Sequence, residues 1–130
     1  MDKKRIAVLM QYANGVLADC YILRSDQTIE DSYNGQTAGF GVSVAMSGLL
    51  PTLAIYYQDA SDSRIIDRRK ILLAIGKMIQ KDKPELQIFD AESLLRVAMR
   101  CDPSIVNQLK QEVIDCAIAL KQVIRTYKLR

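Results

Sequence analysis

The chain contains no histidine, and this absence narrows the chemistry that it can perform. Histidine is the commonest general base near pH 7 and the commonest metal ligand among the side chains. The sequence therefore excludes a histidine-based catalytic triad and a histidine-containing zinc site.

Cysteine is also scarce, since the chain has only Cys20, Cys101 and Cys116. Their number is odd and none of them has Cys-x-x-Cys spacing. Each lies within or beside an apolar periodic segment. This pattern predicts buried, reduced thiols.

Other catalytic patterns are missing as well. Acidic residues such as Asp59 and Asp62 are scattered singly at loop or cap positions, whereas a two-metal nuclease needs several carboxylates that converge on one site. Gly39-Phe40-Gly41 lacks the third glycine and the Gly-Lys-Ser/Thr ending of phosphate-binding loops. We therefore predict no catalytic residue, no metal and no cofactor. A small enzyme is kept only as a third hypothesis.

Neither sign of charge dominates the composition. The net charge is +3 with a pI near 8.8, which permits contact with nucleic acid but is weaker than in a dedicated duplex-DNA binder. A length of 130 residues, with 49% hydrophobic and 25% charged residues, predicts one globular domain over residues 1–130. The start Met-Asp-Lys-Lys-Arg lacks the apolar core of a secretory signal, so we expect a cytoplasmic protein.

The longest uncharged run lies between Asp31 and Asp59 and contains the segment Gly39–Tyr57. Apolar residues surround almost the whole helical wheel of this segment, which indicates a helix packed on several sides at the centre of the core. A bilayer span is the competing interpretation, but glycine, serine and threonine dilute the hydrophobicity. Gly48 and Pro51 interrupt the segment, which predicts either a kinked helix or two abutting helices.

The remaining chain shows helical periodicity in four further segments. We predict a helix over Asp2–Arg24, a surface loop over Ser25–Asn34, and the start of the central segment near Gln36. Further helices are predicted from a Ser61-Asp62-Ser63 cap to about Gln80, from an Asp90 cap, and from Asp102-Pro103 almost to Arg130. In the short helix after Asp90, the predicted buried residues are Leu94, Leu95, Val97, Ala98 and Met99. The predicted fold is an all-α bundle of five or six helices in a single domain.

Basic residues gather on two predicted helices. Lys70, Lys77 and Lys81 lie in a narrow sector and form a first basic ridge, for which an ordinary solvated face is the alternative. A second basic ridge comprises Lys110, Lys121, Arg125 and Lys128, with Ile114 and Ile118 beside it, and a solvated flank is again the alternative. We predict RNA contacts for the two ridges and a subunit contact for the two isoleucines.

Three more basic residues, Lys3, Lys4 and Arg5, lie unfavourably at the positive N-terminal end of the first helix dipole. They indicate either an anionic partner or a frayed, solvated terminus.

The segment from Gly39-Phe40-Gly41 to Tyr57 resembles the signature region of the small helical subunit of type III-B CRISPR effector (Cmr) complexes. The similarity lies in the order of an aromatic-containing helix, a Ser/Asn-Gly-Leu turn and an ending of small and aromatic residues. Ser47-Gly48-Leu49 and Ala54-Ile55-Tyr56 match that order, although Ile55 stands where phenylalanine is expected.

The resemblance implies a non-catalytic subunit of an RNA-guided, RNA-targeting complex that takes part in antiviral defence. It implies repeated copies stacked into a filament that stabilises the guide and target RNA, with other subunits, neighbouring copies and both RNA strands as partners and no membrane contact. Lysine and arginine suit this role because they bind phosphate without reading sequence. The alternative is a helical adaptor or regulator that uses Ile114 and Ile118 for protein contact alone.

Overall fold

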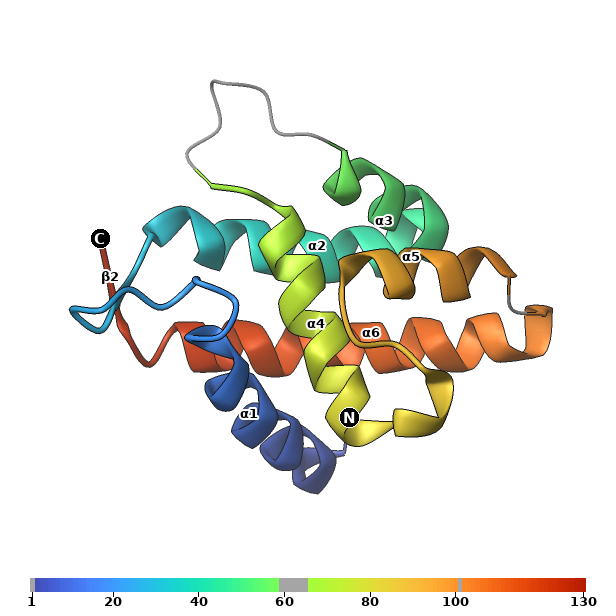
Figure 1. Ribbon diagram of the computed structural model, residues 1–130, viewed down its shortest axis with the longest axis horizontal. Coiled ribbons are helices and arrows are strands. Elements are labelled where there is room, and N and C mark those ends of the chain that lie inside the picture. The colour runs from blue at the N-terminus through green and yellow to red at the C-terminus, as the bar shows by residue number, and fades with distance from the viewer. Residues whose placement is uncertain (1, 59–65, 101) are drawn as a thin grey trace.

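The computed structural model describes residues 2–58, 66–100 and 102–130. These residues form six α-helices, one 3-10 helix and two short strands, which confirms the predicted all-α bundle (Figure 1). The elements in chain order are α1 (Lys3–Leu17), β1 (Thr28–Ile29), α2 (Asp31–Ser47), α3 (Leu49–Tyr57), α4 (Arg69–Asp82), the 3-10 helix η1 (Pro84–Leu86), α5 (Ala91–Arg100), α6 (Pro103–Ile124) and β2 (Lys128–Leu129).

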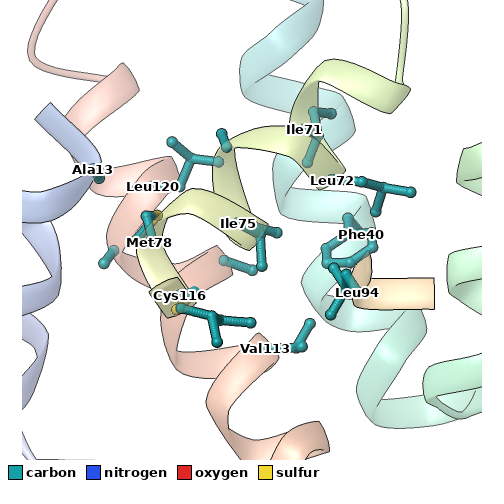
Figure 2. Close-up of a cluster of buried hydrophobic side chains, with 14 of the residues drawn as sticks. Ala13, Phe40, Ile71, Leu72, Ile75, Met78, Leu94, Val113, Cys116 and Leu120 are labelled. Carbon is teal, nitrogen blue, oxygen red and sulfur yellow. The ribbon is translucent and has the colours of Figure 1, made fainter. Parts of the chain in front are cut away.

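Helix α4 lies at the centre of the core and packs against α1, α3, α5 and α6. Its apolar stripe is buried, since Ile71, Leu72, Ile75, Met78 and Ile79 are all inaccessible to solvent. Figure 2 shows four of these side chains in one cluster with Phe40 of α2, Leu94 of α5 and Cys116 of α6. Burial of apolar side chains from all six described helices in one core supplies most of the favourable free energy of folding.

Helix α6 packs against both α1 and α2 and is the longest helix in the described ranges (Figure 1). Its predicted start is confirmed, because the Asp102 carboxylate accepts a hydrogen bond from the Ile105 backbone N–H and Pro103 occupies the first helical position. Its predicted end is wrong. The helix stops at Ile124, and the chain continues into β2.

The central apolar segment is split into two helices at Gly48, in agreement with one of the two predicted alternatives. Gly48 has φ of +100° and ψ of 161°, a conformation that side chains with a Cβ rarely adopt. Pro51 is the third residue of α3, where a backbone N–H has no intrahelical partner, so proline disturbs nothing there. A 2.8 Å hydrogen bond between the Ser43 and Thr52 hydroxyls joins the two helices.

The prediction that this segment forms part of the core is also confirmed. Phe40, Val44 and Leu53 are fully buried, and the rings of Phe40 and Tyr56 meet edge to face with centroids 5.0 Å apart. None of the described helices combines the length and the apolar composition that crossing a bilayer requires.

The prediction for the segment between the first two helices is wrong at both ends. Helix α1 stops at Leu17, not at Arg24, because the chain turns through Tyr21, whose φ is +61°. The predicted loop over residues 25–34 contains β1, which pairs in parallel with β2, and the first turn of α2. Glu30 caps that helix by accepting a hydrogen bond from the Ser32 backbone N–H, so α2 begins five residues before Gln36.

Smaller corrections concern the helices around the core. The predicted Ser61-Asp62-Ser63 cap lies outside the described residues, and α4 begins at Arg69, whose backbone N–H is bound by the Asp67 carboxylate. The Asp90 cap of α5 is confirmed, since its carboxylate accepts a hydrogen bond from the Ser93 N–H at 2.8 Å. Met99 was predicted to be buried but is 50% exposed. The predicted burial of Cys20 and Cys116 is confirmed, whereas Cys101 lies outside the described residues.

Candidate RNA and subunit interface

The second basic ridge lies beside a groove between α2 and α6. The groove has a volume of about 220 Å³, and Ile114, Ile118 and Lys121 of α6 form one of its walls. Small residues line the rest of it, including Ala38, Gly41, Ala45 and Ala117. A groove with small residues along its floor and branched apolar side chains on one wall admits an apolar side chain of another molecule.

Exposed apolar residues of α2 extend this groove beyond the two predicted isoleucines. Val42 lines the groove and is 58% exposed, and Met46 follows one turn later with 82% exposure. The sequence interpretation placed both residues in the buried core segment and so missed them. The signal was present in the sequence, because a segment that is apolar on all sides must present one side outward unless every side has a neighbour.

The structure keeps most of the second basic ridge together. Arg125 donates a 2.9 Å hydrogen bond from Nε to the Asn34 side-chain oxygen. This bond places its guanidinium at the end of the groove nearest the N-terminus of α2. Lys110 lies one turn before Ile114 on α6. Lys128 does not share the helical sector, contrary to the prediction, since it belongs to β2 and is exposed there.

The first basic ridge faces a different neighbour, helix α1 and the turn after it. Lys70 donates to the Tyr21 carbonyl oxygen at 3.5 Å, and the Lys81 ammonium lies over Gly15, at 3.5 Å from the position of an added Cβ. Lys77 is half-buried, and its charge acts on the Cys20 thiol. The two ridges therefore lie along different helix pairs, α1–α4 and α2–α6.

The sequence interpretation missed a cluster of charged residues around Arg5, which we call the Arg5 cluster. Arg5 of α1 pairs with Asp82 at the end of α4 at 3.0 Å and with Asp115 of α6 at 3.1 Å. Its third partner is Glu112 of α6, and Lys83 lies 3.2 Å from Asp82. The anionic partner suggested by the basic start of the chain is therefore, for Arg5, within the chain itself.

Burial and the neighbouring Asp82 carboxylate raise the pKa of Glu112 to about 7, against the opposing attraction of Arg5 and Lys83. The pKa of Asp82 shifts in the opposite direction. Burial alone would raise its pKa, but the neighbouring Glu112, which keeps the shared proton, and the hydrogen bonds from Lys83 and Arg5 outweigh burial and lower the pKa to about 2. The two carboxylates thus share one proton below neutral pH, with Glu112 as its carrier.

Among the described residues, no three acidic, cysteine or histidine side chains come close enough to hold a metal ion. Burial raises the pKa of Cys20 to about 11 and also raises that of Cys116. Both groups are therefore thiols at neutral pH, whereas nucleophilic chemistry requires the thiolate.

The sequence matches one family model, described as CRISPR-associated protein (Cas_Cmr5), over residues 5–127. No curated protein and no solved structure matches the chain. The matched range extends from Arg5 of α1 to Tyr127 beyond α6 and includes both basic ridges except Lys128. The chain therefore belongs to the CRISPR-associated Cmr5 family, the small subunit of type III-B Cmr complexes.

Proposed function

We propose that this subunit is non-catalytic and stabilises the guide and target RNA within the Cmr effector complex, as several copies stacked into a filament in the cytoplasm. The observation that carries the proposal is the family match over residues 5–127, combined with the groove at which basic and apolar side chains lie side by side. Such a surface suits a subunit that contacts RNA and protein together.

The RNA contacts are assigned to the two basic ridges. Lys70, Lys77 and Lys81 are candidates beside α1, and Lys110, Lys121 and Arg125 are candidates beside α2, with Lys128 on β2. Arginine and lysine bind phosphate without reading base identity, which leaves target selection to base pairing with the guide. The chain itself supplies the positive field and the support, and cleavage belongs to other subunits.

The contact between copies is assigned to the groove between α2 and α6. Ile114 and Ile118 form its wall, while Val42 and Met46 offer exposed apolar area beside it. A filament requires a heterologous contact, in which a groove on one copy receives a different surface of the next.

The test is expression of the chain with the remaining Cmr subunits and a guide RNA. A triple variant with Lys110→Glu, Lys121→Glu and Arg125→Glu should lower the RNA retained by the purified complex. A matched variant with Arg96→Glu and Arg100→Glu, which reverses charge of the same sign on the exposed face of α5 away from both ridges, should not. Equal RNA content in the wild type and the triple variant would contradict the RNA role.

One observation favours a second function, that of a helical adaptor without an RNA role. The exposure of Met46 and Val42 beside the groove indicates protein contact independently of any charge. The RNA affinity of the free chain separates the two functions, and replacing Ile118 with glutamate tests the protein contact. A free chain that binds RNA, and an Ile118→Glu variant that keeps this affinity but loses the partner subunits, support the RNA role. A free chain that never binds RNA supports the adaptor.

A further inference from the structure

A cavity of about 460 Å³ opens beside the Arg5 cluster. Helix α6 contributes Gln108, Gln111, Glu112 and Asp115 to its wall, α1 contributes Arg5, and the chain from the end of α4 through η1 contributes Lys83, Glu85 and Leu86. The cavity therefore combines carboxylates, side-chain amides and one apolar surface. Neither basic ridge contributes a residue to its wall, so the proposed RNA contacts do not account for it.

The charges around this cavity do not balance. Three carboxylates, those of Asp82, Glu112 and Asp115, surround the single guanidinium of Arg5. Lys83 is the second cation, but its ammonium binds Asp82 at 3.2 Å and lies 4.0 Å from Glu112, beyond hydrogen-bond distance. When all of these groups are ionised the cluster lacks one positive charge.

One oxygen atom of the Arg5 cluster lacks a hydrogen-bond donor. The Glu112 side chain is 6% exposed, and its Oε1 accepts a hydrogen bond from Arg5 Nη2. Its other oxygen, Oε2, is buried and has no hydrogen-bond partner within the described ranges of the chain. A buried charged acceptor without a donor destabilises the site, so the site favours any group that can donate to Oε2.

The Oε2 atom can be satisfied in two ways. Glu112 can be protonated and donate a hydrogen bond to the Asp82 carboxylate, or a cation that enters from the cavity can donate to the ionised Oε2. The ionisable groups that face Glu112 are Arg5 of α1, Asp82 and Lys83 at the end of α4, Glu85 of η1, and Asp115 and Cys116 of α6. None of them supplies the additional positive charge.

We propose that the cavity receives the guanidinium of an arginine side chain presented by a neighbouring protein subunit. The Glu112 carboxylate turns Oε2 toward the cavity and accepts a hydrogen bond from the guanidinium. The remaining N–H groups face the side-chain oxygens of Gln108 and Gln111, and the aliphatic stem lies along Leu86. Arginine suits the site because its planar array of donors matches a carboxylate and is more weakly hydrated than an ammonium. The excess of carboxylates disfavours RNA phosphate at this place. The source of the arginine rests on the proposed function, since a subunit of an assembly has such neighbours.

The probe is the tripeptide acetyl-Gly-Arg-Gly-amide, added to the full chain and followed through the NMR signals of the Gln108 and Gln111 side-chain amides. Its matched control replaces arginine with citrulline, which has the same shape without the charge. We expect saturable shifts with the arginine peptide and at least tenfold weaker binding of the citrulline peptide. Affinity for the arginine peptide should rise as the pH is raised from 6 to 8, because the entering cation displaces the proton of Glu112.

Glu112→Gln should weaken binding of the arginine peptide at least tenfold, while Glu85→Gln, which removes a carboxylate from the same wall without touching Arg5, should weaken it less than threefold. Both variants should keep the wild-type circular dichroism spectrum. Equal affinities for the two peptides, retained affinity in Glu112→Gln, or an absence of saturable shifts would each overturn the proposal.

The assembled complex separates this inference from the proposed function. If the wild-type chain co-purifies with its complex and Glu112→Gln co-purifies equally well, the arginine site is wrong and the subunit role stands. If the wild-type chain fails to assemble, the subunit role is wrong, and peptide binding by the isolated chain still decides whether the cavity takes a guanidinium.

Discussion

Glu112 couples the stability of this fold to pH. Its pKa rises from the ordinary 4.5 to about 7 on folding, so the folded state binds the proton more tightly than the unfolded state. The stability linked to this proton is fully present below pH 4.5 and is lost as the pH rises through 7. Asp82 has the opposite sign, because its lowered pKa gives stability that is present above pH 3.8 and is lost as the pH falls toward 2.

Replacing Glu112 with glutamine tests this coupling. Glutamine approximates the protonated side chain, so Glu112→Gln should be more stable than the wild type at pH 8 by about 1–3 kcal/mol and should differ less at pH 5. Urea unfolding at several pH values between 5 and 8.5 measures the difference. A variant that is destabilised equally at every pH would show that the proton is not linked to folding.

Gly76 marks a close approach between α4 and the segment before α5. A Cβ at this position would lie 2.6 Å from the Asp90 carbonyl oxygen, and backbone cannot move aside as a flexible side chain can. Gly76→Ala should therefore destabilise the fold by about 1–3 kcal/mol or more. Gly35→Ala is the matched control, because Gly35 lies in α2 with nothing within 4 Å, and alanine there should stabilise by about 0.5–1 kcal/mol. Chemical denaturation of both variants gives the comparison, and equal stabilities would contradict the close packing.

At the scale of the elements, the break between α2 and α3 is assigned to Gly48 and not to Pro51. Gly48→Ala forces a side chain into φ of +100° and should destabilise by about 1–3 kcal/mol. Pro51→Ala should change the free energy of unfolding by less than about 1 kcal/mol, because Pro51 lies in the first turn of α3. Thermal unfolding of the two single variants measures this order, and a larger loss of stability from Pro51→Ala would place the break at the proline.

Helix interiors could be predicted from the sequence, whereas several ends could not. The stripes of α4 and α6 repeat at helical spacing over many residues, so their burial follows from local pattern alone. The parallel pairing of Thr28–Ile29 with Lys128–Leu129 joins segments that are far apart in the chain, and no local pattern announces it. The early end of α1 depends on a positive φ at Tyr21, a residue that gives no turn signal.

The candidate site was predictable to a similar extent. The sector containing Ile114, Ile118 and Lys121 follows from their spacing on one helix, but the groove needs α2 as its second wall. Glu112 could have been noticed, because it lies three residues after Leu109 and four before Cys116, which places a carboxylate on the buried face of α6. Its partners Arg5 and Asp82 come from distant helices and required the structure.

At the scale of the whole molecule, the proposed RNA contacts of the two basic ridges should contribute additively, because the ridges lie on different helix pairs. Removing charge from Lys110, Lys121 and Arg125 should lower the slope of log affinity against log salt by about 0.7 to 0.9 for each RNA phosphate that is no longer neutralised. Removing charge from Lys70, Lys77 and Lys81 should lower it independently, since the two sets share no neighbour helix pair. Fluorescence anisotropy of a labelled RNA across a salt series measures both slopes, and slopes that equal the wild-type value in both triple variants would contradict the assignment of the ridges.

The most direct measurement is the composition and RNA content of a purified Cmr complex that contains this chain. The wild-type chain should co-purify in several copies per complex with the other subunits and the guide RNA. The variant with Lys110→Glu, Lys121→Glu and Arg125→Glu should yield a complex with less bound RNA. An otherwise complete complex that excludes the wild-type chain, or one whose RNA content is unchanged by the charge reversals, would contradict the account.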